Sequence, residues 1–207
     1  TLTNIDLALW QDHYHLNILT WEGGYYFRAS KGMFTDYIDK WMEVKANSKG
    51  GLREIAKLHL NSLYGKFATN PNVTSRYPVL EDGAIKLITA KEEFRNPVYT
   101  AMGVFITAYA RDVTIRAAQL KYDTFLYADT DSLHLNTLDP PKGISVHKAD
   151  LGAWKKEYEF DYGIFWRAKA YCERVPTRAN AMGGTHYETH IAGLPVNVAS
   201  GLTIGDF

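Results

Sequence analysis

Two carboxylates one residue apart, Asp129 and Asp131, stand in a short polar segment between two apolar runs. The runs, 124–127 before the acids and 133–135 after them, have the composition of β-strands, so the segment is predicted to be the tip of a β-hairpin. The tip lacks the Asn-Gly or Asp-Gly pair that favours a tight turn, so something other than turn chemistry would require two acids there. Magnesium takes carboxylate oxygens together with water and substrate phosphates, so the pair suits phosphoryl or nucleotidyl transfer.

Two other interpretations of the acidic pair need to be considered. Asp and Ser are common turn residues that bond their own backbone, and taken alone the Asp-x-Asp triplet favours a solvated loop. An EF-hand calcium loop needs an oxygen ligand two residues beyond Asp131, then a Gly, and later a Glu. The sequence has Leu133, His134 and Pro140 at those places, which excludes the EF-hand.

A helix predicted over 52–67 carries a second set of polar side chains with regular spacing. Arg53, Lys57, Asn61 and Tyr64 are four, four and three residues apart, so they share one face of that helix. Such a stripe is typical of a solvated face, but it also has the groups that bind a nucleotide: cations for phosphate and a phenol ring for the sugar. The residues expected on the opposite, apolar face are Leu52, Ile55, Ala56, His59, Leu63 and Phe67, with His59 as a core histidine.

The segment 167–171 is predicted to be an alternating strand in which Arg167, Lys169 and Tyr171 point the same way. Cations on one face of a strand can prevent the edge of a sheet from pairing with another chain. They also suit a sugar-phosphate backbone that lies across the strand.

The elements that position these side chains follow from spacing and turn signals. The helix 101–120 is expected to deliver the chain to the acidic hairpin with its apolar side chains mostly buried, namely Val104, Phe105, Ala108, Val113, Ile115 and Ala118. The other expected elements are a capped helix over 3–10, a hairpin over 15–28, a helix over 34–44 and an inserted β-hairpin arm over 69–99.

The bulk properties fit a soluble globular protein. At 207 residues the chain can bury a sizeable core, and its single cysteine, Cys172, fits a reducing compartment. The formal net charge of zero argues against a wholesale polyanion-binding domain but leaves room for local basic stripes. The sequence has no apolar run of membrane-spanning length and no cationic leader before an apolar core, so we expect no membrane partner.

Three stretches resemble, in order, the family B DNA polymerases, specifically their protein-primed bacteriophage branch. They are 57–65 (Lys-Leu-His-Leu-Asn-Ser-Leu-Tyr-Gly), 127–132 (Tyr-Ala-Asp-Thr-Asp-Ser) and 169–171 (Lys-Ala-Tyr). The resemblance implies a DNA-directed DNA polymerase that uses two magnesium ions, dNTP substrates and primer-template DNA, with a terminal protein as a further partner that serves as primer. It also implies that the protein is located in the cytoplasm of a bacterial host if the chain is phage-encoded.

The fold that the resemblance implies is an α+β right hand, with an antiparallel-sheet palm, two-helix fingers and a β-hairpin insertion. The expected domains are 1–33, the end of an insertion that contacts the terminal protein; 34–68, the fingers; 69–97, an insertion for processivity and strand displacement; 98–192, the palm; and 193–207, the start of a thumb.

By position in these motifs, Asp131 is expected to be the main metal ligand, with Asp129 supporting the site. Lys57 would hold the triphosphate, Asn61 would help to position the nucleotide, and Tyr64 would pack under the deoxyribose and exclude a 2′-hydroxyl. Gly65 is expected in the same nucleotide site, Lys169 and Tyr171 at the primer terminus, and Lys45, Arg53 and Arg167 as further DNA contacts.

The sequence departs from the family pattern in two ways. It lacks a second metal-binding aspartate in an Asp-x-x-Ser-Leu-Tyr-Pro context, and it lacks the acidic motifs of a proofreading exonuclease. We therefore expect that this chain is a fragment, that a missing portion precedes Thr1, and that the chain does not polymerise DNA by itself.

Two alternatives to a polymerase are considered. One is a non-catalytic DNA-binding remnant that kept the palm. The other is an Asp-x-Asp glycosyltransferase, which leaves the Lys57, Asn61 and Tyr64 stripe and the 169–171 segment unexplained.

Overall fold

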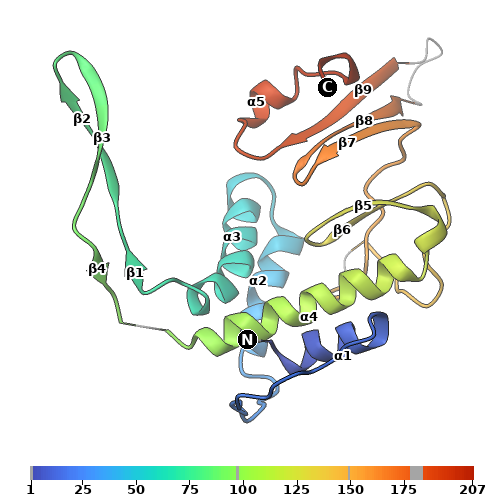
Figure 1. The fold of residues 1–207 in the computed structure, drawn as a ribbon. Helices are drawn as coiled ribbons and strands as arrows, with labels where there is room; N and C mark the ends of the chain where they lie inside the picture. Colours follow the sequence, from blue (N-terminus) through green and yellow to red (C-terminus); the bar gives the residue numbers. More distant parts are fainter. Residues whose placement is uncertain (1, 97, 149, 178–183) are drawn as a thin grey trace. The chain divides into compact units, whose positions relative to one another are not determined.

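Figure 1 shows the structure, a computed structural model that contains helices and antiparallel strand pairs. This mixture confirms the predicted α+β class. The chain folds as two units, Thr1–Tyr109 and Ala110–Phe207. None of the described helices is both long and apolar enough to cross a membrane. The structure describes residues 2–96, 98–148, 150–177 and 184–207.

The first unit begins with helix α1 (Asn4–His13), as predicted. Thr3 caps it, because its hydroxyl accepts the backbone N–H of Asp6 at 3.0 Å. The hairpin expected over 15–28 is wrong, since this described stretch contains no strand. Phe27 packs against Tyr99 and Phe105, but Tyr25 and Tyr26 are 93% and 96% exposed, and an isolated two-stranded hairpin is marginal in water.

Helices α2 (Thr35–Asn47) and α3 (Gly50–Phe67) lie side by side, and both were predicted (Figure 1). The predicted apolar face of α3 is only partly correct. Ala56 is buried, but Leu52 and Ile55 remain 53% and 49% exposed. Periodicity shows which face of a helix is apolar, and it does not show whether a neighbour covers every turn of that face.

The predicted β-hairpin arm is confirmed. Its two-residue turn, Asp82-Gly83, has φ values of 53° and 75°, and positive φ at both positions is the type I′ geometry that Asp-Gly favours. Both long strands are largely exposed. The arm consists of a short pair, β1 (Asn72–Val73) with β4 (Glu93–Phe94), and a longer pair, β2 (Arg76–Glu81) with β3 (Ala84–Thr89).

Helix α4 (Thr100–Gln119) confirms the predicted helix, and its predicted burial holds at Ala108 but not at the larger aliphatic side chains. Val104, Val113 and Ile115 are 45%, 55% and 39% exposed. The buried positions hold small side chains instead, because α4 approaches its neighbours closely. A Cβ added to Gly103 would lie 2.7 Å from the Cβ of Ala68. The positions of α4 that are buried are Gly103, Ala108, Thr114 and Ala117.

The second unit contains two separate antiparallel sheets, and no backbone ladder joins them among the described residues. The first sheet is the predicted acidic hairpin, and the second has three strands in chain order. The core of the second sheet includes Ala170, Cys172 and Val175. The elements in order are η1 (Tyr122–Thr124), β5 (Phe125–Asp129), β6 (Ser132–Leu135), β7 (Tyr162–Arg167), β8 (Ala170–Thr177), β9 (Gly184–Ile191), α5 (Val196–Ala199) and η2 (Ile204–Asp206).

The single strand predicted over 167–171 is wrong. Strand β7 ends at Arg167, which pairs with Ala170 at the start of β8, and Ala168 and Lys169 form the turn between them. Lys169 has a φ of 58°, in the left-handed region. Arg167, Lys169 and Tyr171 therefore do not share one face of a strand.

Candidate functional site

The tip of the β5–β6 hairpin is a strained turn that its surroundings hold in place. Asp129 pairs with Ser132, and the N–H of Asp131 donates to the carbonyl of Asp129 at 2.6 Å. Thr130 has a φ of 51°, which is unfavourable for a β-branched side chain. The carbonyl of Thr130 accepts the hydroxyl of Thr114 at 3.0 Å, and the carbonyl of Asp129 accepts the hydroxyl of Ser132 at 3.1 Å. Helix α4 and strand β6 thus fix the turn.

The two carboxylates of this tip have different environments. Asp129 accepts hydrogen bonds from Lys169 Nζ at 2.7 Å and from the Thr130 hydroxyl at 3.0 Å. The hydrogen bond from Lys169 lowers the pKa of Asp129 against the opposing effect of burial, and the same contact raises the pKa of Lys169. The carboxylate of Asp131 is exposed and makes no hydrogen bond or ion pair with any other described residue. Asp131 is therefore available to an external cation.

The tip of the β7–β8 hairpin is attached to strand β5 through Lys169. The backbone N–H of Lys169 donates to the hydroxyl of Tyr127 at 2.8 Å, and the ammonium group of Lys169 bonds Asp129. Tyr171 is buried behind this tip, with its ring 5.2 Å from that of Tyr127, and burial raises the pKa of Tyr171 to about 12. The structure thus brings Asp129, Asp131, Lys169 and Tyr171 together, while Arg167 is exposed with its guanidinium over the ring of Trp166.

A buried polar network lies between the same two sheets, and sequence reasoning missed it. Glu173 is completely buried, and its two carboxylate oxygens contact His134 Nδ1 and the hydroxyl of Tyr158, each at 2.7 Å. Burial and the contact with Glu173 raise the pKa of Tyr158 far above its usual range, so Tyr158 donates as a neutral phenol. The available signal was the position of Glu173 two residues after Tyr171, on the same face of one strand.

The acidic tip offers too few side-chain ligands to enclose a metal ion by itself. Among the described residues, no group of three or more His, Cys, Asp or Glu side chains is arranged to hold a metal. Asp129 and Asp131 offer two carboxylates, and magnesium is commonly bound by one or two carboxylates plus substrate phosphates. The tip therefore fits a metal that is held jointly by protein and substrate, rather than an all-protein metal cage.

The predicted polar stripe lies on α3, in the first unit. Asn61 and Tyr64 are exposed, and Lys57 forms an ion pair with Glu54 at 2.8 Å. A Cβ added to Gly65 would meet nothing within 4 Å, so the backbone there is open to close approach.

Two residues of α3 also hold the helix pair together. Arg53 is half-buried and donates to the carbonyl of Lys45 at 2.8 Å, so it joins α3 to the last turn of α2. His59 stacks on Trp41 at 3.9 Å, and its Nδ1 lies 3.0 Å from the hydroxyl of Tyr37. His59 is therefore a packing histidine with its contacts satisfied, as predicted, but it is half-buried and not part of the core.

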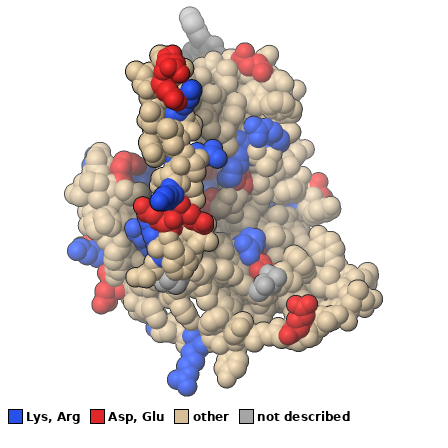
Figure 2. Space-filling view, turned by 60° about the vertical axis from the view of Figure 1, so that its left-hand side comes forward, with Lys and Arg blue, Asp and Glu red and all other residues tan. Residues whose placement is uncertain are grey.

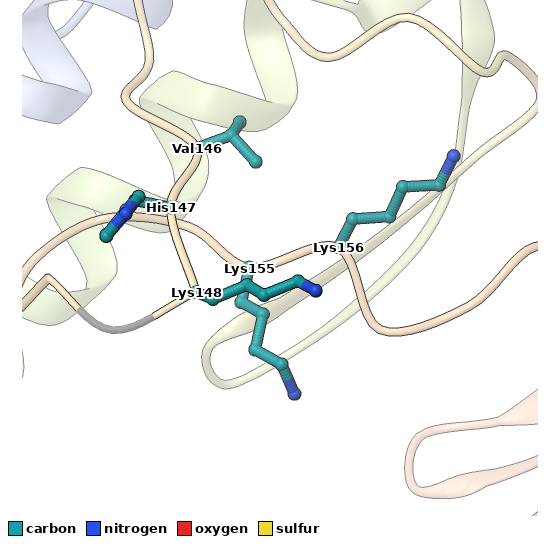
Figure 3. A pocket seen from close by; sticks show the side chains of 5 residues that line it. All are labelled: Val146, His147, Lys148, Lys155 and Lys156. Atoms are coloured by element: carbon teal, nitrogen blue, oxygen red, sulfur yellow. The ribbon is translucent and has the colours of Figure 1, made fainter. Parts of the chain in front are cut away.

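A shallow cavity of about 390 Å³ lies in the loop that precedes β7, lined by Val146, His147, Lys148, Lys155 and Lys156 (Figure 3). Lys155 and Lys156 form ion pairs with Glu157 and Glu159. Cationic and acidic side chains are likewise interspersed over the face in Figure 2. The cavity therefore does not concentrate positive charge.

Comparison with known proteins adds independent findings. A family model described as DNA polymerase type B, organellar and viral, matches residues 1–149. The chain is 47% identical over 177 residues to the DNA polymerase of Bacillus phage Nf, an alignment that covers 84% of this chain and 31% of that protein. It is 34% identical over 208 residues to the DNA polymerase of Streptococcus phage Cp-1, covering 100% of this chain and 36% of that protein.

A solved structure of phi29 DNA polymerase, complexed with primer-template DNA and incoming nucleotide substrates, matches with a TM-score of 0.83 at 39% identity. The match covers 99% of this chain and 38% of that chain. The chain thus spans about a third of the length of the relatives that it matches.

Proposed function

The chain belongs to the type B DNA polymerases of organelles and viruses, and we propose that it contributes the metal-binding and primer-binding hairpins of template-directed dNMP transfer to a primer 3′-hydroxyl. One observation carries the proposal. An unpaired carboxylate, Asp131, stands beside a carboxylate that Lys169 already holds at 2.7 Å, on a turn with little freedom to move. That arrangement can take a metal and a phosphate together while keeping the second acid in a fixed orientation.

We assign the binding of two magnesium ions to Asp131, with Asp129 in support. Bound magnesium would stabilise negative charge on the attacking and leaving oxygens of the transferred phosphoryl group. Because Lys169 lowers the pKa of Asp129, that acid is ionised at neutral pH. Lys169 and Tyr171 are assigned to the primer terminus, where Lys169 also sets the orientation of Asp129.

The fingers are assigned to 34–68 and the palm to 98–192, followed by the start of a thumb over 193–207. In the fingers, Lys57 would hold the triphosphate and Asn61 would help to position the nucleotide. Tyr64 would pack under the deoxyribose, with the open backbone at Gly65 beside it. DNA contacts are assigned to Lys45, Arg53 and Arg167. Arg53 can make such a contact although it also joins α2 and α3, because its bond to the carbonyl of Lys45 uses only part of its five-donor guanidinium.

The exposed β-hairpin arm is assigned to processivity and strand displacement over 69–97. Leu80 and Ile85 are 73% and 75% exposed, so its apolar surface is available to other molecules. In a chimera in which this chain replaces the matching segment of the Bacillus phage Nf polymerase, replacing 74–91 by a short Gly-Ser linker should shorten the products made per binding event and leave the single-nucleotide rate intact. Equal product lengths would refute this assignment.

The segment 1–33 is assigned to contact with a terminal-protein primer. Leu19 and Tyr26 are 87% and 96% exposed, which is unusual for large apolar side chains and favours a protein partner. In the same chimera, exchanging both for Ser should reduce protein-primed initiation but not extension of a DNA primer. An equal effect on both reactions would show that the segment has another role.

The catalytic assignment is tested by primer extension with a chimera, in which this chain replaces the matching segment of the Bacillus phage Nf polymerase. Asp131→Asn should slow nucleotide incorporation by at least about 100-fold, because metal stabilisation of the transition state is worth several kcal/mol. DNA affinity should change little. Asp139→Asn, an exposed acid in the loop after β6, is the matched control and should extend normally. If the Asp131→Asn chimera extends at the wild-type rate, the non-catalytic DNA-binding alternative is favoured.

A further inference from the structure

The relative position of the two functional hairpins needs a physical cause. Strands β5 and β6 form one sheet, and β7 to β9 form another, with no ladder between them among the described residues. Backbone hydrogen bonds therefore do not set how Asp131 on the first hairpin stands relative to Lys169 on the second. Contacts that involve side chains have to set this position.

Aromatic packing supplies one set of such contacts. The ring of His134, on β6, lies 4.9 Å from that of Tyr171 and 5.3 Å from that of Phe165, both edge to face. Tyr127 lies 5.4 Å from the same imidazole. These contacts bury apolar surface, but burial is non-directional, so they do not specify one register by themselves.

Glu173 supplies a directional contact. It is fully buried on β8, and burial of a carboxylate is costly unless both of its oxygens are satisfied. One oxygen contacts Nδ1 of His134 across the gap between the sheets, and the other accepts the hydroxyl of Tyr158. Both contacts are short, at 2.7 Å, and hydrogen bonds depend strongly on direction, so this pair tolerates little sliding of one sheet on the other.

The contact at His134 reaches the acidic turn through Ser132. Nε2 of His134 lies 3.5 Å from the Ser132 hydroxyl, and that hydroxyl donates to the carbonyl of Asp129 at 3.1 Å. His134 and Ser132 are two residues apart in one short strand, so a shift of the imidazole moves the turn with it.

We propose that Glu173 is a positioning residue of the polymerase site, which acts through His134 to keep the Asp129–Asp131 turn in register with the Lys169 turn. This inference rests on the proposed function for its catalytic meaning, and its structural part is independent of that function. Lys169 joins the two hairpins at their tips through Asp129 and Tyr127. Behind the tips, Glu173 is the charged contact to the first sheet among the described residues of β8, since the neighbouring Arg174 binds Asp161 at 2.8 Å.

The test separates positioning from simple stability. His134→Phe keeps a ring but leaves Glu173 buried with one oxygen unpaired, so that variant is expected to be unstable. The double variant, His134→Phe with Glu173→Leu, removes both partners of that contact and should regain part of the lost thermal stability, since the half-buried hydroxyl of Tyr158 also loses its acceptor. Glu173→Gln has an amide oxygen that can accept a hydrogen bond from His134. This conservative variant should therefore keep the two hairpins in position.

The readout is backbone amide exchange in the full chain, followed by NMR. The Asp131 and Lys169 amides are the probes, since each donates a hydrogen bond within the two tips. In the double variant both should exchange about tenfold faster than in the wild type, because the tips open locally. The Asp161 amide, which bonds the carbonyl of Arg174 at 3.0 Å, should be unchanged, and Glu173→Gln should restore protection at both tips.

In the chimera, the double variant should lower kcat with little change in KM for dNTP, as expected when orientation rather than binding is lost. Wild-type amide protection at both tips in the double variant would overturn the inference, whatever the extension rate. The proposed function fails by a different result, namely normal extension by Asp131→Asn, so the two failures can be told apart.

Discussion

Asp129 and Asp131 lie on one turn but have opposite electrostatic situations. Asp129 is 22% exposed and bonded to Lys169, whereas Asp131 is exposed and has no partner among the described residues. The ion pair with Lys169 therefore balances the negative charge of Asp129, whereas the carboxylate of Asp131 remains open to an external cation. The sequence predicted both acids and Lys169, but not their pairing, because the pairing depends on two hairpins from different sheets meeting at their tips.

The pairing predicts a specific effect of pH. Since the folded pKa of Asp129 lies below its ordinary value of 3.8, the contact with Lys169 stabilises the fold at neutral pH. This stabilisation is lost as the pH falls through the folded pKa. In Lys169→Met, the pKa of Asp129 should rise toward or above its ordinary value, because burial then acts without the lysine.

The measurement is a pH titration of the side-chain carboxyl ¹³C shifts without added divalent metal. Asp161 is the internal control, because its pKa is lowered by Arg174 and should stay lowered in Lys169→Met. An unchanged pKa for Asp129 would show that Lys169 is not the cause.

At the scale of the elements, strong periodicity and turn chemistry were reliable guides. They predicted α2, α3, α4, the arm with its Asp82-Gly83 turn, and the acidic hairpin. They failed at 15–28, where the described stretch contains no strand. They also failed at 167–171, because the turn there carries no Gly, Asn or Pro signal. Lys169 adopts a left-handed φ of 58° where its N–H and ammonium group bond Tyr127 and Asp129. Tertiary contacts override local preference at this point, and a single sequence does not display them.

The close approach of α4 to the end of α3 gives a prediction for stability. A methyl group at Gly103 would come within 3.0 Å of the backbone of Ala68, which cannot move aside cheaply. Gly103→Ala should destabilise the chain, because overpacking costs about 1–3 kcal/mol and exceeds the roughly 0.5–1 kcal/mol that Ala gains in a helix.

Urea denaturation measures this change in the free energy of unfolding. Gly51→Ala is the matched control, since a Cβ there meets nothing within 4 Å, and it should be neutral or stabilising. A Gly103→Ala chain as stable as Gly51→Ala would contradict the close packing of α4.

At the scale of the whole molecule, the formal net charge of zero and the mixed surface charge leave DNA binding to local groups (Figure 2). The candidate residues come from both units, with Lys57, Asn61 and Tyr64 on α3 and the acidic and Lys169 tips in the second unit. Sequence motifs identified these residues, and the fold explained how the tips are held. Only the structure revealed that Glu173 is buried, because its position two residues after Tyr171 indicates a shared face of the strand but not what covers that face.

The central claim, that Asp131 is the cation ligand of this site, is tested most directly by titrating Mn²⁺ into the ¹⁵N-labelled chain. Paramagnetic broadening should appear first at the amides of 129–132, and Asp131→Asn should abolish it there while leaving the spectrum otherwise intact. Broadening that begins at other acids, such as Glu157, or that persists unchanged at 129–132 in Asp131→Asn, would contradict the assignment.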